Sequence, residues 1–199
     1  MFGPMMSFNT VESRFTSPSS FCPWPEYWHS PDENSTEDEV SQLVAAFVRA
    51  LQPEFVLETG TAYGFTTYRI GIALLVNGHG KVVSVDSDAK MVELAKAYIS
   101  HQLPSGQFPG EVLHQNSMEY TPPQDIDFAF FDSWQEGRAL EFRRFYDMGF
   151  IKPGTIVAFH DTAPHHQVWK SVSKLQEEGL IRGITLHTPR GITFAEVLK

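Results

Sequence analysis

Residues 55 to 64 read F-V-L-E-T-G-T-A-Y-G, and the rest of the chain is arranged around this segment. Phe55 to Leu57 form a short apolar run after a proline, which is typical of a strand buried on both faces of a parallel sheet. Gly60 and Gly64 then mark a tight turn, and a helical pattern follows from Thr66. The stretch therefore predicts a strand, a glycine loop and a helix whose first backbone amides lie beside any ligand that the loop admits.

The spacing of the two glycines distinguishes between ligands. A dinucleotide fingerprint, G-x-G-x-x-G, needs a second glycine where this chain has Ala62, because the pyrophosphate lies against the backbone there. Glu58 precedes the loop, and its carboxylate would repel a pyrophosphate but attract a cationic or amine-bearing ligand. The pattern E-x-G-x-x-x-G resembles the first motif of class I S-adenosylmethionine-dependent methyltransferases. The resemblance implies that Glu58, Gly60, Thr61 and Gly64 bind this cofactor, and a plain turn without a ligand is the alternative.

The composition limits the class of function. A chain of 199 residues suits one α/β domain with a sizeable core. The net charge of -9 argues against nucleic acid or an anionic membrane as partner, because phosphate contacts require a basic patch, so we expect a small-molecule acceptor. Cys22 is the only cysteine, which fits a cytoplasmic protein without disulfides. The sequence has neither an apolar run of transmembrane length nor a signal-peptide pattern.

Residues 1–34 are expected to form an N-terminal arm, and residues 35–199 the methyltransferase domain. The arm is rich in proline, serine and aromatic residues and shows no helical or alternating period. Because disordered segments usually lack aromatic residues, we expect the arm to pack on the domain, on a partner subunit of a homodimer, or over the active site. A frayed tail with a few docked rings is the alternative.

The remaining pattern predicts alternating helices and strands. Thr36 and Glu39 form a capping-box pattern at the start of a helix that runs to about Leu51, and Asp88 is placed to cap another helix. Further helices are expected over 66–76, 91–99, 136–148 and 167–178, and strands over 81–85, 111–114, 126–131 and 155–159, followed by a hairpin of 184–187 and 192–197. This order predicts an α/β fold, a single doubly wound, Rossmann-like domain with a mostly parallel seven-stranded sheet and a C-terminal antiparallel hairpin. The same plan resembles the methyltransferase family from about residue 36 to the C-terminus.

Polar residues follow strand after strand of this predicted sheet, where ligands of open α/β sheets bind. Asp86 ends the second strand, and a carboxylate there can accept both hydroxyls of a ribose, a role that the resemblance assigns to it. An unpaired turn aspartate is the alternative. By the same resemblance Asn116 and Ser117, after the third strand, would meet the adenine edge, although a plain loop fits them equally well.

The fourth and fifth strands carry a second resemblance. The segments F-F-D-S-W-Q-E-G-R and I-K-P-G-T-I-V-A-F-H-D-T resemble the metal-dependent O-methyltransferases of the catechol and caffeoyl-CoA type and the related sugar and macrolide enzymes. This implies that Asp132 and Asp161 hold a magnesium ion. Neighbouring parallel strands lie ~4.8 Å apart, so carboxylates on adjacent strand ends can share one ion. The alternative is that both aspartates only cap the following helices.

Two departures from the family pattern bear on the chemistry. His160 stands where the family has the first residue of an Asp-Asn pair, and a histidine favours a transition metal, or no metal with His160 as general base. Gln135 stands where the catechol enzymes have a proton-accepting lysine, so His160, His165 or His166 would have to accept the proton. Trp134 is interpreted as a core side chain, or as a wall of the adenine or acceptor pocket.

These observations predict an S-adenosylmethionine-dependent methyltransferase that methylates an oxygen of a small hydroxylated metabolite, in one form with the help of Mg2+ or another divalent metal. The expected catalytic residues, which are also the expected metal ligands, are Asp132, His160 and Asp161, and Asp132 is expected to contact the cofactor as well. Two alternatives belong to other classes: a nicotinamide-dependent oxidoreductase on the same kind of sheet, and a cofactor-binding module without catalysis.

Overall fold

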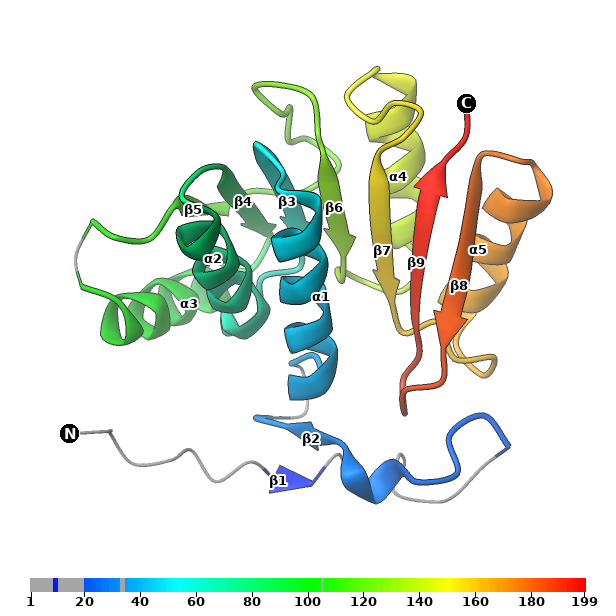
Figure 1. The fold of residues 1–199 in the computed structure, drawn as a ribbon, viewed down its shortest axis with the longest axis horizontal. Helices are drawn as coiled ribbons and strands as arrows, with labels where there is room; N and C mark the ends of the chain where they lie inside the picture. Colours follow the sequence, from blue (N-terminus) through cyan, green and yellow to red (C-terminus); the bar gives the residue numbers. More distant parts are fainter. Residues whose placement is uncertain (1–8, 11–19, 33–34, 105) are drawn as a thin grey trace.

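The computed structural model describes residues 9–10, 20–32, 35–104 and 106–199. Its main feature is a seven-stranded sheet with the strand order β5-β4-β3-β6-β7-β9-β8 (Figure 1). Five neighbouring strands, from β5 to β7 in this order, pair in parallel, and β9 is antiparallel to both of its neighbours, β7 and β8. The strands are β3 (Phe55–Thr59), β4 (Lys81–Asp86), β5 (Gly110–His114), β6 (Phe128–Phe131), β7 (Ile156–His160), β8 (Ile181–Leu186) and β9 (Ile192–Val197). The predicted α/β fold with a terminal antiparallel hairpin is confirmed.

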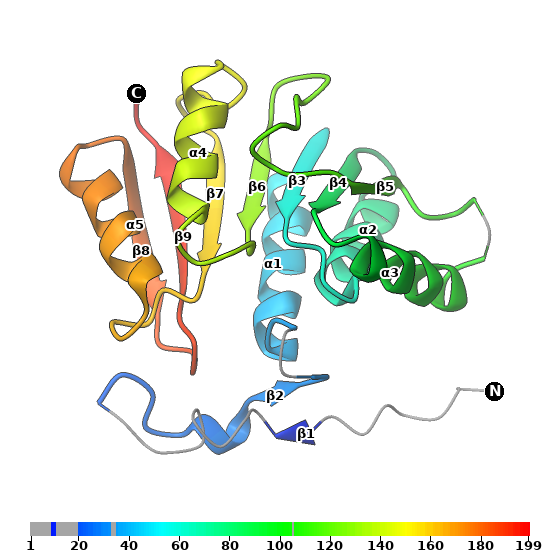
Figure 2. The same ribbon diagram turned by 180° about the vertical axis from the view of Figure 1, so that it is seen from behind.

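Helices cover both faces of the sheet (Figures 1 and 2). They are α1 (Asp38–Leu51), α2 (Phe65–Asn77), α3 (Ala89–Gln102), α4 (Arg138–Asp147) and α5 (Gln167–Glu177). Apolar residues of α1 and α2 pack with Val56 and Phe130 in one cluster, whereas those of α4 and α5 pack with Leu57 and Phe131 in another. Val56 and Leu57 are consecutive residues of β3, and consecutive strand residues point to opposite faces of the sheet. Helices α1 and α2 therefore lie on one side of β3 and β6, and α4 and α5 lie on the other.

The central strands are continuous apolar runs because both of their faces are covered. Every residue of β3 and β6 is buried. Phe131 stacks on Phe159 of β7 with ring centroids 5.1 Å apart and meets Phe142 of α4 edge to face. This packing fixes the carboxyl ends of β3, β6 and β7 relative to one another, and the candidate site lies at these ends.

The described part of the N-terminal segment lies on the side of the sheet where the parallel strands end (Figures 1 and 2). It contains the short strands β1 (Asn9–Thr10) and β2 (His29–Ser30), which pair with each other, and the 3-10 helix η1 (Pro25–Tyr27). Phe21 packs on His187 next to the terminal hairpin, with ring centroids 4.3 Å apart, whereas Trp24 and Tyr27 are exposed. The rest of the predicted arm lies outside the described residues, and the division of the chain at residue 34 stays a prediction.

The predicted capping box is wrong. Helix α1 begins after Glu37, which makes no side-chain capping hydrogen bond. The Thr36 hydroxyl instead donates to the Asp132 carboxylate at 2.7 Å, and Glu39 accepts the backbone N–H of His29 at 3.0 Å. The residue types fit a capping box, but both side chains form hydrogen bonds with residues outside the helix instead. The Asp88 cap is confirmed, since its carboxylate accepts the backbone N–H groups of Lys90 and Met91.

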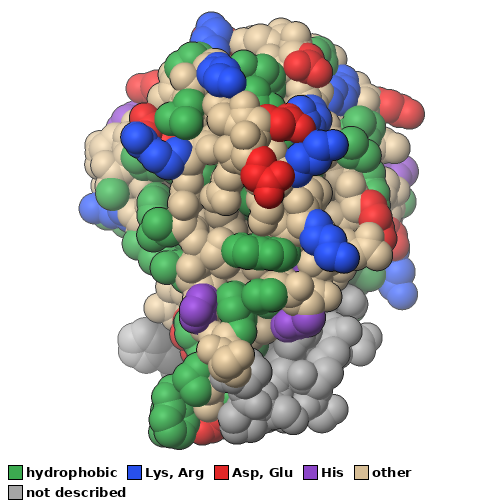
Figure 3. Space-filling model, turned by 90° about the vertical axis from the view of Figure 1, so that its right-hand side faces the viewer, with side chains coloured by type: hydrophobic (Ala, Val, Ile, Leu, Met, Phe, Trp, Pro, Cys, Tyr) green, Lys and Arg blue, Asp and Glu red, His purple; other side chains and the backbone are tan. Residues whose placement is uncertain are grey.

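The surface around β8 and α5 carries charges of both signs. Acidic and basic side chains are interspersed over this face rather than gathered into a patch of one sign (Figure 3). None of the helices in the described ranges combines the length and the apolar character that crossing a membrane requires.

Candidate active site

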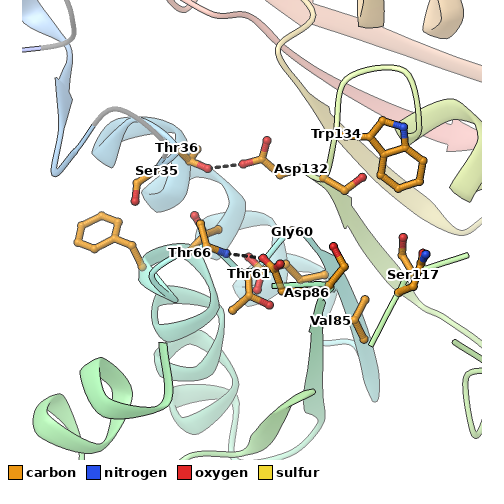
Figure 4. A pocket seen from close by; sticks show the side chains of 16 residues that line it. Ser35, Thr36, Gly60, Thr61, Thr66, Val85, Asp86, Ser117, Asp132 and Trp134 are labelled. Atoms are coloured by element: carbon orange, nitrogen blue, oxygen red, sulfur yellow. Dashed lines mark hydrogen bonds between the residues drawn. The ribbon is translucent and has the colours of Figure 1, made fainter. Parts of the chain in front are cut away.

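A cavity of about 380 Å3 opens at the carboxyl ends of β3, β4, β5 and β6 (Figure 4). Its walls come from the segment before α1, the loop between β3 and α2, the start of α2, and the ends of the next three strands. The lining residues are Ser35, Thr36, Glu58, Gly60, Thr61, Ala62, Phe65, Thr66, Val85, Asp86, Ser87, Asn116, Ser117, Asp132, Ser133 and Trp134. Six predicted site residues are thus brought together here, whereas Gly64, His160 and Asp161 do not line the cavity.

The glycine loop is shaped by positive φ angles and by a close backbone approach. Gly60 has φ +84°, and a Cβ at this position would lie 2.3 Å from the backbone carbonyl oxygen of Asp132. Only glycine therefore lets the loop pack against the chain that leaves β6. Gly64, with φ +78°, precedes α2 and packs against Ala95, so it shapes the turn from outside the cavity. Ala62 also adopts a positive φ of 46°.

Asp86 is held at the end of β4 by two backbone amides. One carboxylate oxygen accepts the N–H of Ala62 in the glycine loop, and the other accepts the N–H of Asp88, both at 2.9 Å. These bonds fix the direction of the carboxylate and connect it to the loop. Since a carboxylate has about four acceptor positions, each oxygen keeps a lone pair that can accept a hydroxyl of a ligand.

Glu58, which was predicted to attract a cationic ligand, lines the cavity from a buried position in β3. Its side chain is almost completely buried, and the Thr67 hydroxyl donates to it. Burial raises the pKa of Glu58 to about 8, because a carboxylate loses its hydration there. The raised pKa favours the protonated form of this carboxyl group, and its hydrogen bond to Thr67 connects β3 to α2.

Ser117 lies at the cavity wall above a second buried acid, Glu141. The hydroxyls of Ser117 and Thr59 both donate to the Glu141 carboxyl group, which is completely buried. Glu141 thus ties the loop after β5 to β3 and to α4. Sequence analysis did not identify this residue, because it looks like one of several charged residues on an amphipathic helix.

The expected catalytic residues Asp132, His160 and Asp161 form part of a buried ionic cluster. His160 is completely buried between two carboxylates: its Nδ1 lies 3.0 Å from Asp132 and its Nε2 lies 2.7 Å from Glu37. Burial alone would lower the pKa of His160, but the carboxylates of Asp132, Asp161 and Glu37 outweigh it and raise the pKa to about 9. A protonated imidazole donates from both nitrogens and has no lone pair for a proton or a metal. This environment argues against His160 as the general base.

Two arginines complete the cluster. Arg138, the first residue of α4, contacts Asp132 at 3.0 Å and Asp161 at 2.8 Å through the same terminal nitrogen. Arg190, from the turn between β8 and β9, forms two hydrogen bonds to the Asp161 carboxylate and donates its backbone N–H to Glu37. Burial would raise the pKa values of Asp132 and Asp161, but the charges of His160 and Arg138 hold both pKa values below their ordinary range.

The predicted metal ligands lie close together but are already paired with other side chains. One ligand atom each from Asp132, His160 and Asp161 lies within 4.8 Å of the others, as a shared ion requires. However, the Arg138 guanidinium bridges the two aspartates, and both nitrogens of His160 face carboxylates. The side chains as they are arranged do not fit a divalent ion.

Trp134 lies at the mouth of the cavity, whereas Gln135 and His166 do not line it. Trp134 is 45% exposed and lines the cavity mouth, and Gly137 makes room for its ring, since a Cβ there would lie 2.0 Å from it. Gln135 lies 3.2 Å from the Nδ1 atom of His166. Burial lowers the pKa of His166 to about 4, which makes it a weak base. None of the described residues that line the cavity is a histidine.

A parallel sheet with a glycine loop after β3, an aspartate at the end of β4 and a cavity between them defines the class I methyltransferase architecture. The methyltransferase-domain family matches residues 57–162, and the chain belongs to this family. The matched range runs from within β3 through the glycine loop to the residues after β7, and it contains every lining residue of the cavity except Ser35 and Thr36.

Solved structures of methyltransferases share this fold at low sequence identity. The S-adenosylhomocysteine-bound methyltransferase PaMTH1 of Podospora anserina has a TM-score of 0.72 at 14% identity, over 84% of this chain and 81% of that one. The O-methyltransferase TomG of Streptomyces achromogenes, involved in tomaymycin synthesis and solved with S-adenosylmethionine, has a TM-score of 0.65 at 17% identity, covering 84% and 83%. An O-methyltransferase from Bacillus cereus in complex with S-adenosylhomocysteine has a TM-score of 0.65 at 17% identity, covering 83% and 84%.

Proposed function

We propose that this protein is an S-adenosylmethionine-dependent O-methyltransferase that acts on a small hydroxylated metabolite. One observation carries the proposal: a single cavity joins the glycine loop, the Asp86 carboxylate and the segment from Asp132 to Trp134 (Figure 4). Its volume of about 380 Å3 is within the range of small-molecule sites. The cofactor or its product is bound in the solved structures of PaMTH1, TomG and the Bacillus cereus enzyme, which supports the choice of ligand.

The cofactor would occupy the part of the cavity between the glycine loop and the end of β5. Asp86 would accept the two ribose hydroxyls, because its oxygens are already aimed by the amides of Ala62 and Asp88. Gly60 would let the ligand approach the backbone, and Asn116 and Ser117 would flank the base. Glu58 and Thr61 would support this part of the site from below, since Thr61 is bonded to Ser84 of β4 at 2.6 Å.

The acceptor would occupy the part of the cavity next to Thr36, Asp132 and Trp134. The methyl group of the sulfonium is already activated, so the protein mainly has to align the acceptor oxygen, the methyl carbon and the sulfur. The Thr36 hydroxyl donates to one Asp132 oxygen, and an acceptor hydroxyl beside Thr36 would donate to the remaining lone pair of the same oxygen. Because its pKa is low, Asp132 orients this hydroxyl rather than acting as a strong base. As the oxygen–carbon bond forms and the sulfur–carbon bond breaks, the hydroxyl oxygen becomes strongly acidic and its proton passes to water in the cavity. His160 and Asp161 then act as positioning residues behind Asp132.

Calorimetric titration of the protein with S-adenosylhomocysteine tests the proposal. We expect the wild type to bind S-adenosylhomocysteine but not NADH. We expect Asp86→Asn to weaken binding about tenfold to a hundredfold, because hydrogen bonds to a charged group are worth about 1.5–3 kcal/mol each. Asp125→Asn serves as the matched control, since Asp125 is an exposed carboxylate paired with Lys152 outside the cavity. Tight NADH binding without S-adenosylhomocysteine binding would contradict the proposal.

A further inference from the structure

The ionic cluster behind the cavity is balanced in charge. It contains three carboxylates, Glu37, Asp132 and Asp161, and three basic side chains, Arg138, His160 and Arg190. Five of the six side chains are less than 10% exposed, and Arg190 is 12% exposed. A dication added to this buried set would leave two uncompensated positive charges in a region with little water, which is energetically costly.

The carboxylate oxygens that would bind a metal are already used by the protein. Asp161 meets Arg190 through one oxygen at 2.6 Å and Arg138 through the other at 2.8 Å. Both its oxygens are thus bound to guanidinium nitrogens. Oxygen ligands lie about 2.0–2.1 Å from Mg2+, so an ion between Asp132 and Asp161 would have to displace the Arg138 guanidinium.

Arg138 is held in this place by the ends of two strands. Its Nε donates to the backbone carbonyl of Ser133, directly after Asp132, at 2.9 Å. Another guanidinium nitrogen donates to the backbone carbonyl of His160 at the end of β7. The same side chain therefore binds the backbone and the aspartates of both β6 and β7, and it is only 3% exposed. A planar guanidinium suits this role because its donors point in fixed directions.

We propose that the Arg138 guanidinium takes the place of a divalent ion between Asp132 and Asp161, so that the site orients its acceptor without a metal. The guanidinium supplies the positive charge that holds the two strand ends together and keeps Asp132 ionised toward the cavity. The inference rests on the proposed function only in placing the cluster beside the acceptor. The ion binding itself can be measured independently of methyl transfer.

The test measures Mn2+ binding by electron paramagnetic resonance. The protein is first treated with a chelator to remove bound metal, and the measurement is made with and without S-adenosylhomocysteine. We expect wild type and Asp132→Asn to leave the signal of free Mn2+ equally unchanged. We also expect chelator treatment to leave the affinity for S-adenosylhomocysteine unchanged. Uptake of one Mn2+ by the wild type that Asp132→Asn abolishes would overturn the proposal.

Arg138→Gln provides a gain-of-binding test. Removal of the guanidinium leaves Asp132 and Asp161 facing each other, and we expect this variant to take up one Mn2+, which Arg138→Gln combined with Asp132→Asn should not. A folded Arg138→Gln protein that binds no Mn2+ would show that the guanidinium does not occupy an ion position. If this variant does not fold, the comparison of Mn2+ uptake by the wild type and by Asp132→Asn still tests the proposal. A titration with S-adenosylhomocysteine, run in parallel, separates failure of the proposed function from failure of this inference.

Discussion

Gly60→Ala is expected to abolish binding of S-adenosylhomocysteine and to lower the free energy of unfolding by about 3 kcal/mol or more. The new methyl group would lie 2.3 Å from the carbonyl oxygen of Asp132, in a backbone conformation with φ +84°. Backbone atoms surround this position, so no flexible side chain can move to relieve the clash. The loop would have to separate from β6, and the cofactor side of the cavity would lose its shape. Chemical denaturation and calorimetric titration measure the two effects.

Gly78→Ala is the matched control for this substitution. Gly78 ends α2 with a similar φ of +80°, but nothing lies within 4 Å of a Cβ built there. The control therefore has only the conformational penalty of about 1–2 kcal/mol and should bind S-adenosylhomocysteine normally. If Gly60→Ala bound the ligand as the control does, the close approach of the loop to Asp132 would not matter for the site.

Glu37→Gln is expected to destabilise the protein by about 3–5 kcal/mol at pH 7, because it removes one charge from a completely buried ionic cluster. The imidazole of His160 would lose one of its carboxylate partners, and the backbone N–H of Arg190 would lose a charged acceptor. The buried cluster would then hold one more positive than negative charge. Glu54→Gln is the control, since the side chain of Glu54 is 73% exposed and its partner His79 lies at the surface. Denaturant unfolding of the two variants should give clearly different midpoints.

The same cluster predicts a pH dependence of stability. The pKa of His160 is raised from its ordinary value of 6.5 to about 9, so the folded state holds a proton that the unfolded state releases between these values. The stabilisation is therefore fully present below pH 6.5 and is lost as the pH rises through 9. We expect the wild type to lose stability over this window and Glu37→Gln to lose less. Equal slopes in both proteins would mean that Glu37 does not hold the proton on His160.

The sheet and the cavity were predictable because both depend on local patterns. Apolar runs such as 128–131 marked the central strands, and the topology of parallel strands brings their carboxyl ends together. For this reason Glu58, Asp86 and Asp132 were correctly placed at one edge of the sheet. The helix that was predicted from residue 136 begins at Arg138, and the strand that was predicted from residue 184 begins at Ile181. Element ends depend on contacts that the local sequence does not show.

The ion pairs of the cluster were not predicted. Asp132, His160 and Asp161 were expected together at the strand ends, but Glu37 and Arg190, which pair with them, come from distant parts of the chain. Glu37 lies just before α1, and Arg190 lies in the turn of the hairpin, and neither position indicates a buried ion pair. Arg138 did carry a signal. A cation at the first position of a helix is unfavourable for the helix dipole, so an arginine there needs a local anionic partner. Once Asp132 and Asp161 were expected at the neighbouring strand ends, such a first-turn arginine was a candidate counterion for both.

A crystal structure with S-adenosylhomocysteine would test the central claim most directly. The expected result is electron density for the nucleoside in the cavity between the glycine loop and the end of β5, with both ribose hydroxyls hydrogen-bonded to the Asp86 carboxylate and the sulfur directed toward Asp132. Density for the ligand elsewhere on the molecule, or a ribose that does not touch Asp86, would contradict the proposed site.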